Sequence, residues 1–238
     1  MTLSIIVPVY NERQTILEVL RQLEVINFGM ESEIIVVDNG STDGTRELLK
    51  SQFTTPNLQT NLKSKIKAIF QKENRGKGAA LRRGIQEAKG EIIVIQDADL
   101  EYNPKELPKL IQPLLENKSK VVYGSRFLGN SPHQYLIFYW GNKLISLLFR
   151  IFYRLKITDP MTGYKILKKE ILNDFSLKAE GFEIEIELTA KILKAGYQIL
   201  ELPISYQSRT YREGKKIKWL DGLKCLWTFL SIKFSPLC

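Results

Sequence analysis

Two aspartates, Asp97 and Asp99, follow an apolar run at residues 91–96 and most directly suggest chemistry. Carboxylate oxygens suit Mg²⁺ or Mn²⁺, and a bound cation lets carboxylates hold an anionic diphosphate that they would otherwise repel. If the run is a strand, its alternation directs both side chains the same way. A lone Asp-x-Asp is also common in turns and helix caps, so its interpretation depends on the surrounding elements.

The first half of the chain predicts an α/β fold with a mostly parallel sheet flanked by helices. Its β-rich runs are apolar throughout, as in strands covered on both faces, and helical patterns separate them. We expect strands at residues 3–10, 33–38, 66–71, 91–96 and 120–125, and helices at 13–25, 45–51, 78–88 and 104–116. Ligands of such sheets bind at the carboxyl ends of the strands, where this chain places mainly acidic residues. This placement favours a metal and diphosphate site at Asp97 and Asp99.

The composition excludes several other classes. A chain of 238 residues with 44% hydrophobic residues can bury a core, and its two cysteines provide neither a disulfide framework nor a thiolate zinc cluster. The dinucleotide-binding fingerprint and the Walker A motif are both absent. The net charge of +9 suits anionic partners without choosing among them. Because the basic residues are spread out and form no nucleic-acid-binding motif, we expect no nucleic acid partner.

Five short motifs stand in order along the chain: VPVYNE at 7–12, DNGSTDGT at 38–45, ENRGKG at 73–78, DAD at 97–99 and GSR at 124–126. Together they resemble family 2 inverting glycosyltransferases and, within that family, the dolichyl- and polyprenyl-phosphate mannosyl- and glucosyltransferases. The resemblance spans about residues 3–216. It implies a GT-A fold, a nucleoside-diphosphate sugar as the donor and Mg or Mn as the cofactor.

The resemblance also implies which residues hold the donor. The nucleoside positions are matched by Pro8, Tyr10, Glu12 and Asp38. The metal and diphosphate positions are matched by Asp97, Ala98 and Asp99. Glu101 stands where the lipid-phosphate branch often has Gln; it could ligate the metal, shift the metal preference or cap the helix that follows.

The glycine-rich segment at residues 73–80 is expected to approach the donor through Gly76 and Lys77. Gly76 and Gly78 suit a tight turn between a strand and a helix. The charges of Arg75 and Lys77 are interpreted first as solvated cations at a helix start, with phosphate binding as the alternative.

The acceptor side is predicted from its chemistry. A hydroxyl acceptor needs a general base, whereas a lipid monophosphate, with a second pKa near 6, is largely dianionic at pH 7 and needs cations to position it. By resemblance, these cations are Arg126, counted with Asp97 and Asp99 as catalytic, together with Arg212 and Lys216. A solubilising basic loop is the alternative reading of the residue 209–216 cluster.

Further acceptor-side features follow from the same resemblance. Residues 158–164 resemble a segment near the acceptor, and residues 181–188 match a helix that borders its cleft. Glu183 or Glu187 is the candidate base if the acceptor is a hydroxyl. The single histidine, His133, has a turn-like context and is assigned no role.

The chain divides into residues 1–126, the nucleotide-sugar-binding half of a GT-A domain; residues 127–216, its acceptor-binding half; and residues 217–238, an amphipathic C-terminal segment. The apolar tract at 135–153 is interrupted by polar residues, which argues against a spanning helix. On a helical projection Lys143, Arg150 and Arg154 form a basic stripe beside a broad apolar face, which suits a bilayer with acidic lipids. Packing of these amphipathic helices on the domain or on a second copy in a homo-oligomer is the alternative.

The leading hypothesis is an inverting hexosyltransferase that moves a hexose from UDP-glucose or GDP-mannose to a polyprenyl or dolichyl phosphate. We expect it to work peripherally on the cytoplasmic side of the membrane, since the first residues read as a strand rather than as a signal peptide. One alternative is a soluble glycosyltransferase that acts on a saccharide or protein hydroxyl. Another is a sugar-nucleotide-binding protein without catalysis. The sugar, the nucleobase, the lipid and the oligomeric state stay open.

Overall fold

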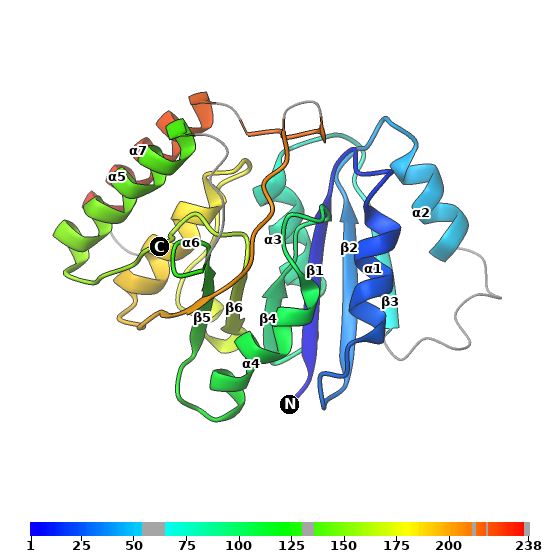
Figure 1. Cartoon of the computed structure of the whole chain (residues 1–238), viewed down its shortest axis with the longest axis horizontal. Coiled ribbons are helices and arrows are strands. Elements are labelled where there is room, and N and C mark those ends of the chain that lie inside the picture. The colour runs from blue at the N-terminus through cyan, green and yellow to red at the C-terminus, as the bar shows by residue number, and fades with distance from the viewer. Residues whose placement is uncertain (54–64, 130–135, 211–212, 218, 236–238) are drawn as a thin grey trace.

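The computed structural model describes residues 1–53, 65–129, 136–210, 213–217 and 219–235 (Figure 1). Its strands form one sheet in the order β3-β2-β1-β4-β6-β5-β7. Their bounds are β1 (Leu3–Val9), β2 (Ser32–Asp38), β3 (Lys65–Phe70), β4 (Ile92–Ile95), β5 (Val121–Ser125), β6 (Lys165–Lys168) and β7 (Leu200–Pro203). Among these, β6 runs antiparallel to both neighbours, β4 and β5, while the other pairs are parallel. The predicted mostly parallel α/β sheet is confirmed.

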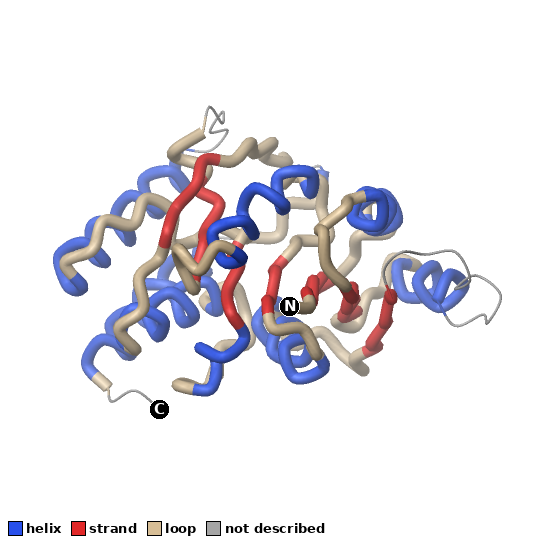
Figure 2. The backbone as a smooth tube through the Cα atoms, turned by 90° about the horizontal axis from the view of Figure 1, so that it is seen from below, coloured by secondary structure: helices blue, strands red, loops and turns tan. Residues whose placement is uncertain are grey.

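Helices cover both faces of the sheet (Figures 1 and 2). They are α1 (Ile16–Val25), α2 (Thr45–Phe53), α3 (Lys77–Glu87), α4 (Leu107–Leu115), α5 (Leu136–Tyr153), α6 (Ile184–Lys194) and α7 (Trp219–Phe234), with short 3-10 turns η2 (Pro104–Glu106) and η3 (Lys169–Asn173). Alternate strand residues face opposite layers: Ile5 and Val7 pack with α1 and α4, while Ile6 packs with α3 and α6. Each fully buried aliphatic side chain contributes about 1.5–3 kcal/mol, so these two layers hold the strand ends in place.

The five strands expected in the first half are present, with ends shifted by a few residues. Strand β6 is not among the elements predicted from the sequence. Its four residues, Lys165–Lys168, are too few to show a period, and an antiparallel strand does not need a helical crossover before it. Because β6 and β7 join the same sheet as β1, the two halves expected on either side of residue 126 share one sheet.

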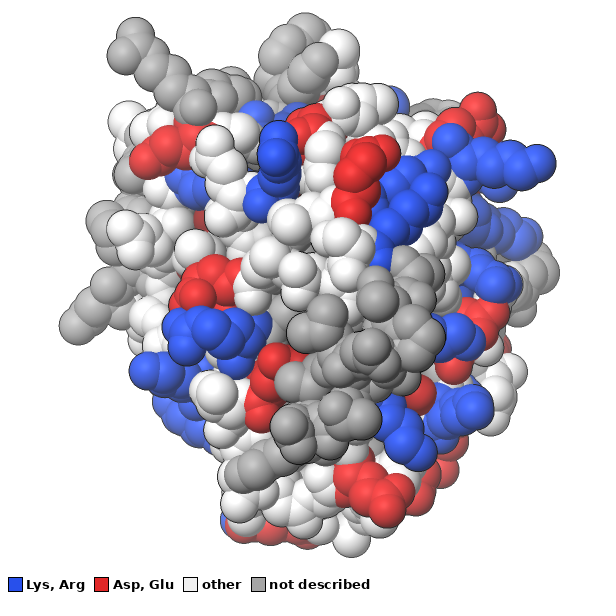
Figure 3. All heavy atoms as spheres, turned by 90° about the vertical axis from the view of Figure 1, so that its right-hand side faces the viewer, with Lys and Arg blue, Asp and Glu red and all other residues white. Residues whose placement is uncertain are grey.

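A third apolar cluster joins α5, α6 and α7 beyond the edge of the sheet. Its fully buried members include Phe149 of α5, Ile186 of α6 and Phe229 of α7, and the rings of Phe149 and Phe229 meet edge to face at 4.8 Å. Within the described residues, none of the helices is both long and apolar enough for a bilayer crossing. On the face beside α2 and β3, basic and acidic side chains are interspersed (Figure 3).

Candidate active site

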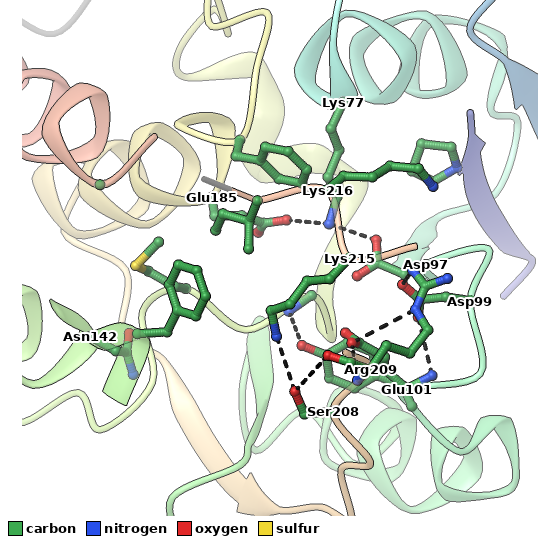
Figure 4. A pocket seen from close by; sticks show the side chains of 18 of the residues that line it. Lys77, Asp97, Asp99, Glu101, Asn142, Glu185, Ser208, Arg209, Lys215 and Lys216 are labelled. Atoms are coloured by element: carbon green, nitrogen blue, oxygen red, sulfur yellow. Dashed lines mark hydrogen bonds and ion pairs between the residues drawn. The ribbon is translucent and has the colours of Figure 1, made fainter. Parts of the chain in front are cut away.

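A cavity of about 740 Å³ opens at the carboxyl ends of the central strands and extends to α5 and α7 (Figure 4). The predicted site residues that line it are Pro8, Tyr10, Glu12, Gly76, Lys77, Asp97, Ala98, Asp99, Glu101, Arg126 and Lys216. Asp38 is fully buried and does not line it; it binds the Arg46 guanidinium at 2.7 Å, and its neighbour Asn39 lines the cavity instead. Arg212 and His133 lie outside the described residues.

Two features of the backbone bring these residues together: the parallel pairing of the central strands and the close packing of Gly76 against another loop. Strand β1 pairs with β2 and β4, so the loops that follow all three strands leave the sheet at the same edge. Gly76 has φ +96°, and a Cβ there would lie 2.3 Å from the carbonyl oxygen of Glu180, so only glycine fits. Asp97 and Asp99 lie in the loop after β4, which ends at Ile95, and therefore outside the strand alternation that predicted their shared direction.

Lys77 bridges two carboxylates inside the cavity. Its Nζ lies 2.6 Å from Oδ1 of Asp97 and 2.8 Å from Oε1 of Glu185, and its side chain is 14% exposed. Burial lowers the pKa of Lys77, but the two carboxylates outweigh burial and raise it overall. The expectation that Lys77 is a solvated cation is therefore wrong, because Glu185, more than a hundred residues away along the chain, supplies a partner that the local motif does not reveal. Arg75 is exposed and pairs with Glu180.

Arg209 holds the other acidic side chains at this end. Its guanidinium donates to Glu12 at 2.9 and 3.1 Å and to Asp99 at 2.8 Å, and its Nε lies 3.8 Å from Glu101. Lys216 also pairs with Glu12. The basic segment is predicted from the sequence, but a role for Arg209 is not, because its contact with Glu12 joins residues 197 positions apart and no local pattern indicates such a pair.

The acidic end carries more negative charge than these cations neutralise. Burial, then repulsion from Asp97 and Glu101, raises the pKa of Asp99 to about 7, although Arg209 acts in the opposite direction. Hard oxygen donors with surplus negative charge fit a divalent cation. No group of three metal-ligating side chains converges within the described chain, so Asp97 and Asp99 would supply at most two protein ligands, as is usual for Mg²⁺. Glu101 accepts from Tyr206 Oη at 2.8 Å and from the Arg209 amide at 2.7 Å.

Arg126 lines the cavity as part of a buried network. Its Nε and Nη2 donate to the two carboxylate oxygens of Asp159 at 2.7 Å, and its backbone amide donates to the same carboxylate at 3.0 Å. Burial lowers the pKa of Arg126, but Asp159 outweighs burial and raises it. Glu201 of β7 accepts from the Asp159 amide at 2.9 Å, and the Tyr206 ring lies 5.0 Å from the guanidinium. Arg126 therefore faces the cavity in one fixed orientation.

The candidate bases Glu183 and Glu187 do not line the cavity. Glu187 accepts from the amides of Lys178 and Ala179, and Glu183 from the amide of Gly181 at 3.0 Å. Glu185 lines the cavity instead. It pairs with Lys165, which is fully buried, and with Lys77. Burial raises the pKa of Glu185, but the two lysines outweigh burial and lower it.

The far end of the cavity is apolar. Its walls there come from α5 and α7 and include Leu144, Ile145, Leu223 and Leu226. Each helix packs one apolar face into the protein and leaves a second one exposed. The exposed residues, each between 49% and 74% accessible, are Leu136, Trp140, Leu144, Leu147 and Ile151 on α5 and Leu220, Leu223, Trp227 and Phe234 on α7. Arg150 and Arg154 of the predicted basic stripe are exposed, and the Lys143 ammonium lies 4.5 Å from the centre of the Phe127 ring.

A family model described as glycosyl transferase family 2 matches residues 4–175. The chain is 32% identical over 222 residues to dolichol-phosphate mannosyltransferase of Pyrococcus furiosus, covering 90% of this chain and 59% of that protein. It is 28% identical over 207 residues to glycosyltransferase AglJ of Haloferax volcanii, covering 86% of this chain and 63% of that protein. The chain thus spans about three fifths of the length of these two relatives.

Solved structures share the fold. Glucosyl-3-phosphoglycerate synthase from Mycobacterium tuberculosis, in complex with Mn²⁺, uridine diphosphate and phosphoglyceric acid, matches with a TM-score of 0.72 at 22% identity, covering 99% of this chain and 79% of that one. Its complex with uridine diphosphate alone matches with a TM-score of 0.71 at 21% identity, covering 99% and 81%.

Proposed function

Because the chain belongs to glycosyltransferase family 2, we propose that it transfers a hexose from a nucleoside-diphosphate sugar to a polyprenyl phosphate at a membrane surface. Its membership makes it a glycosyltransferase. The sugar donor, the lipid acceptor and the place of action are the proposal. One observation carries it: a single cavity begins among carboxylates at the strand ends and finishes on apolar walls from α5 and α7.

The acidic end suits the donor. Pro8 and Tyr10, with Asn39 and Asn74, would border the nucleoside, since these residues line the cavity beside the carboxylates. Asp97 and Asp99 would hold the divalent cation, Mg or Mn, which would neutralise the charge of the leaving diphosphate. The Mn²⁺ and uridine diphosphate bound to the synthase from Mycobacterium tuberculosis support this choice of ligands.

The acceptor end suits a nucleophile that is already ionised. Lys77 and Lys165 hold Glu185 as a carboxylate with a lowered pKa, which makes it a weak base. A phosphate monoester needs none, since it is largely dianionic at pH 7. Its oxygen would attack the anomeric carbon with inversion, a new carbon–oxygen bond would form, and the nucleoside diphosphate would leave with the electron pair of the bond that breaks. Arg126 would position the attacking phosphate.

The outer surface suits a bilayer. The exposed apolar stripes of α5 and α7 adjoin the apolar end of the cavity, which Leu144 and Leu223 also line, and Arg150 and Arg154 are exposed as well. The cytoplasmic leaflet carries anionic lipids that attract such cations, which is why the proposal places the enzyme peripherally on that side. The name of the relative from Pyrococcus furiosus supports a dolichol-phosphate acceptor.

The test is a transfer assay with radiolabelled UDP- and GDP-sugars, Mg²⁺ or Mn²⁺, and polyprenyl phosphate in vesicles, followed by organic extraction. We expect label in the organic phase only when the lipid carries a phosphate, so polyprenol is the matched control acceptor. Phosphoglyceric acid tests a small phosphorylated acceptor. Label on phosphoglyceric acid or on a saccharide hydroxyl, with none on the lipid, would overturn the lipid proposal.

A further inference from the structure

Asn142 on α5 carries a buried acceptor that the site described above does not use. The residue is 3% exposed and lines the cavity. Its Nδ2 donates to Oδ1 of Asp159 at 3.1 Å, whereas its Oδ1 is buried and has no hydrogen-bond partner among the described residues. Figure 4 shows it across the pocket from Asp99 and Glu101. Two other buried atoms of cavity-lining residues lack a hydrogen bond, but both take part in ion pairs. Glu185 Oε1 lies 2.8 Å from the Lys77 ammonium, and Arg209 Nε lies 3.8 Å from the Glu101 carboxylate.

The orientation of the Asn142 amide follows from its partner. Asp159 accepts three hydrogen bonds from Arg126, so its carboxylate acts only as an acceptor toward Asn142. The amide nitrogen must therefore face Asp159, because a flipped carbonyl would meet the carboxylate oxygen and repel it. Oδ1 is left facing away from Asp159 as an acceptor. A buried acceptor without a donor costs free energy, so a ligand that brings a donor there gains affinity.

The donor group can be identified by elimination among the substrates of the proposed function, on which this inference rests. A phosphate dianion and a prenyl chain carry no hydrogen-bond donor, and the nucleoside would lie at the opposite end beside Pro8 and Tyr10. Hydroxyl groups remain. We infer that Asn142 recognises a hydroxyl group of the transferred hexose through Oδ1.

The test compares wild type with Asn142→Ala on a donor panel in which each sugar hydroxyl in turn is replaced by fluorine, which does not donate. For one analogue, the loss in kcat/KM relative to the parent donor should be at least about fivefold larger in wild type than in Asn142→Ala. Comparing the same analogue in both proteins cancels its intrinsic reactivity. If Asn142 acts only by positioning Asp159 and Arg126, Asn142→Ala should lower kcat/KM equally for the parent donor and for each analogue. An unchanged ratio of parent to analogue across the whole panel would therefore overturn the inference.

A second arm compares polyprenyl phosphate with phosphoglyceric acid, which carries a hydroxyl group. If the donor panel shows no coupling but Asn142→Ala selectively loses activity with phosphoglyceric acid, the hydroxyl belongs to that acceptor and the assignment to the hexose is overturned. If no coupling is seen in either arm, the inference is contradicted. Ser146→Ala is the matched control on the next turn of α5: its Oγ bonds the backbone carbonyls of Asn142 and Thr158 and it does not line the cavity, so its ratios should equal those of wild type.

Failure of the proposed function is separable from failure of this inference. If wild type transfers no sugar at all, the proposed function fails. Calorimetric titration of wild type and Asn142→Ala with the same sugar nucleotides then reports the coupling through dissociation constants. Equal losses of affinity for each analogue in the two proteins would refute the role of Asn142.

Discussion

The two ends of the cavity neutralise charge in different ways. At the acidic end, Arg209 lies among three carboxylates, and burial together with repulsion from Asp97 and Glu101 raises the pKa of Asp99. At the acceptor end, one arginine meets one aspartate in a two-bond pair, with the carboxylate fully buried. At the acidic end, a metal ion that holds the diphosphate can replace the side-chain cations that now pair with the carboxylates. The proposed acceptor end is already organised before any ligand arrives.

The difference teaches how each end should respond to mutation. At the acidic end, where several charged side chains share their contacts, the loss of one side chain should affect ligand binding more than folding. Where a single pair is buried, losing one partner leaves an uncompensated charge, so folding and acceptor binding should both suffer.

The largest expected effect is on catalysis at the acidic end. Asp99→Ala should lower the rate of sugar transfer by more than about 100-fold, because the cation and the leaving diphosphate lose a ligand. The thermal melting temperature should change little, since Asp99 lies in a bend and its partner Arg209 keeps Glu12. Initial rates and melting curves of the same preparation check both statements, and near-normal turnover would rule out the metal role.

The acceptor end should respond in folding as well. Asp159→Ala leaves the Arg126 guanidinium without its carboxylate, with an expected cost of about 3 kcal/mol in the free energy of unfolding. Urea denaturation measures it. The double variant Arg126→Met with Asp159→Leu should regain most of the loss, because neither charge then remains buried. A single variant as stable as wild type would show that the pair is not the organising contact.

The membrane face gives a smaller effect. Trp140→Glu or Trp227→Glu should each weaken sedimentation with acidic vesicles by about tenfold, since a large aromatic surface no longer enters the bilayer. Both side chains are more than 60% exposed, so stability should be preserved. Val25→Glu on α1, also 65% exposed, is the matched control and should sediment as wild type does. Unchanged sedimentation of both tryptophan variants would favour packing on a partner subunit.

The smallest effect on the rate of transfer is expected from Glu185→Gln. A base-free reaction should lose less than about tenfold in rate, whereas loss of a general base typically costs 10²–10⁴-fold. The rate should fall below about pH 6, where the acceptor phosphate takes up a proton, and this limb should be the same in wild type and the variant. Disappearance of the acid limb in Glu185→Gln would instead assign it to the enzyme and make Glu185 the base.

The same two ends differ in how far the sequence predicts them. The strands of the donor half, with Asp97 and Asp99 at a strand end, follow from local apolar runs and turn residues. The ion pairs that define the site cannot be predicted from local patterns, because Arg209 contacts Glu12 and Lys77 contacts Glu185 only in the folded chain. The helices α5 and α7 were expected as amphipathic. Which face packs could not be predicted, because both faces are apolar and the choice depends on α6.

The central claim is that carboxylates at the strand ends hold an anionic diphosphate through a divalent cation. Calorimetric titration with UDP and GDP, with and without Mn²⁺, tests it most directly in wild type and in Asp97→Asn. We expect one nucleotide to bind wild type only when Mn²⁺ is present and to lose most of its affinity in the variant. Equal binding with and without the cation, or an unchanged affinity in Asp97→Asn, would contradict the account.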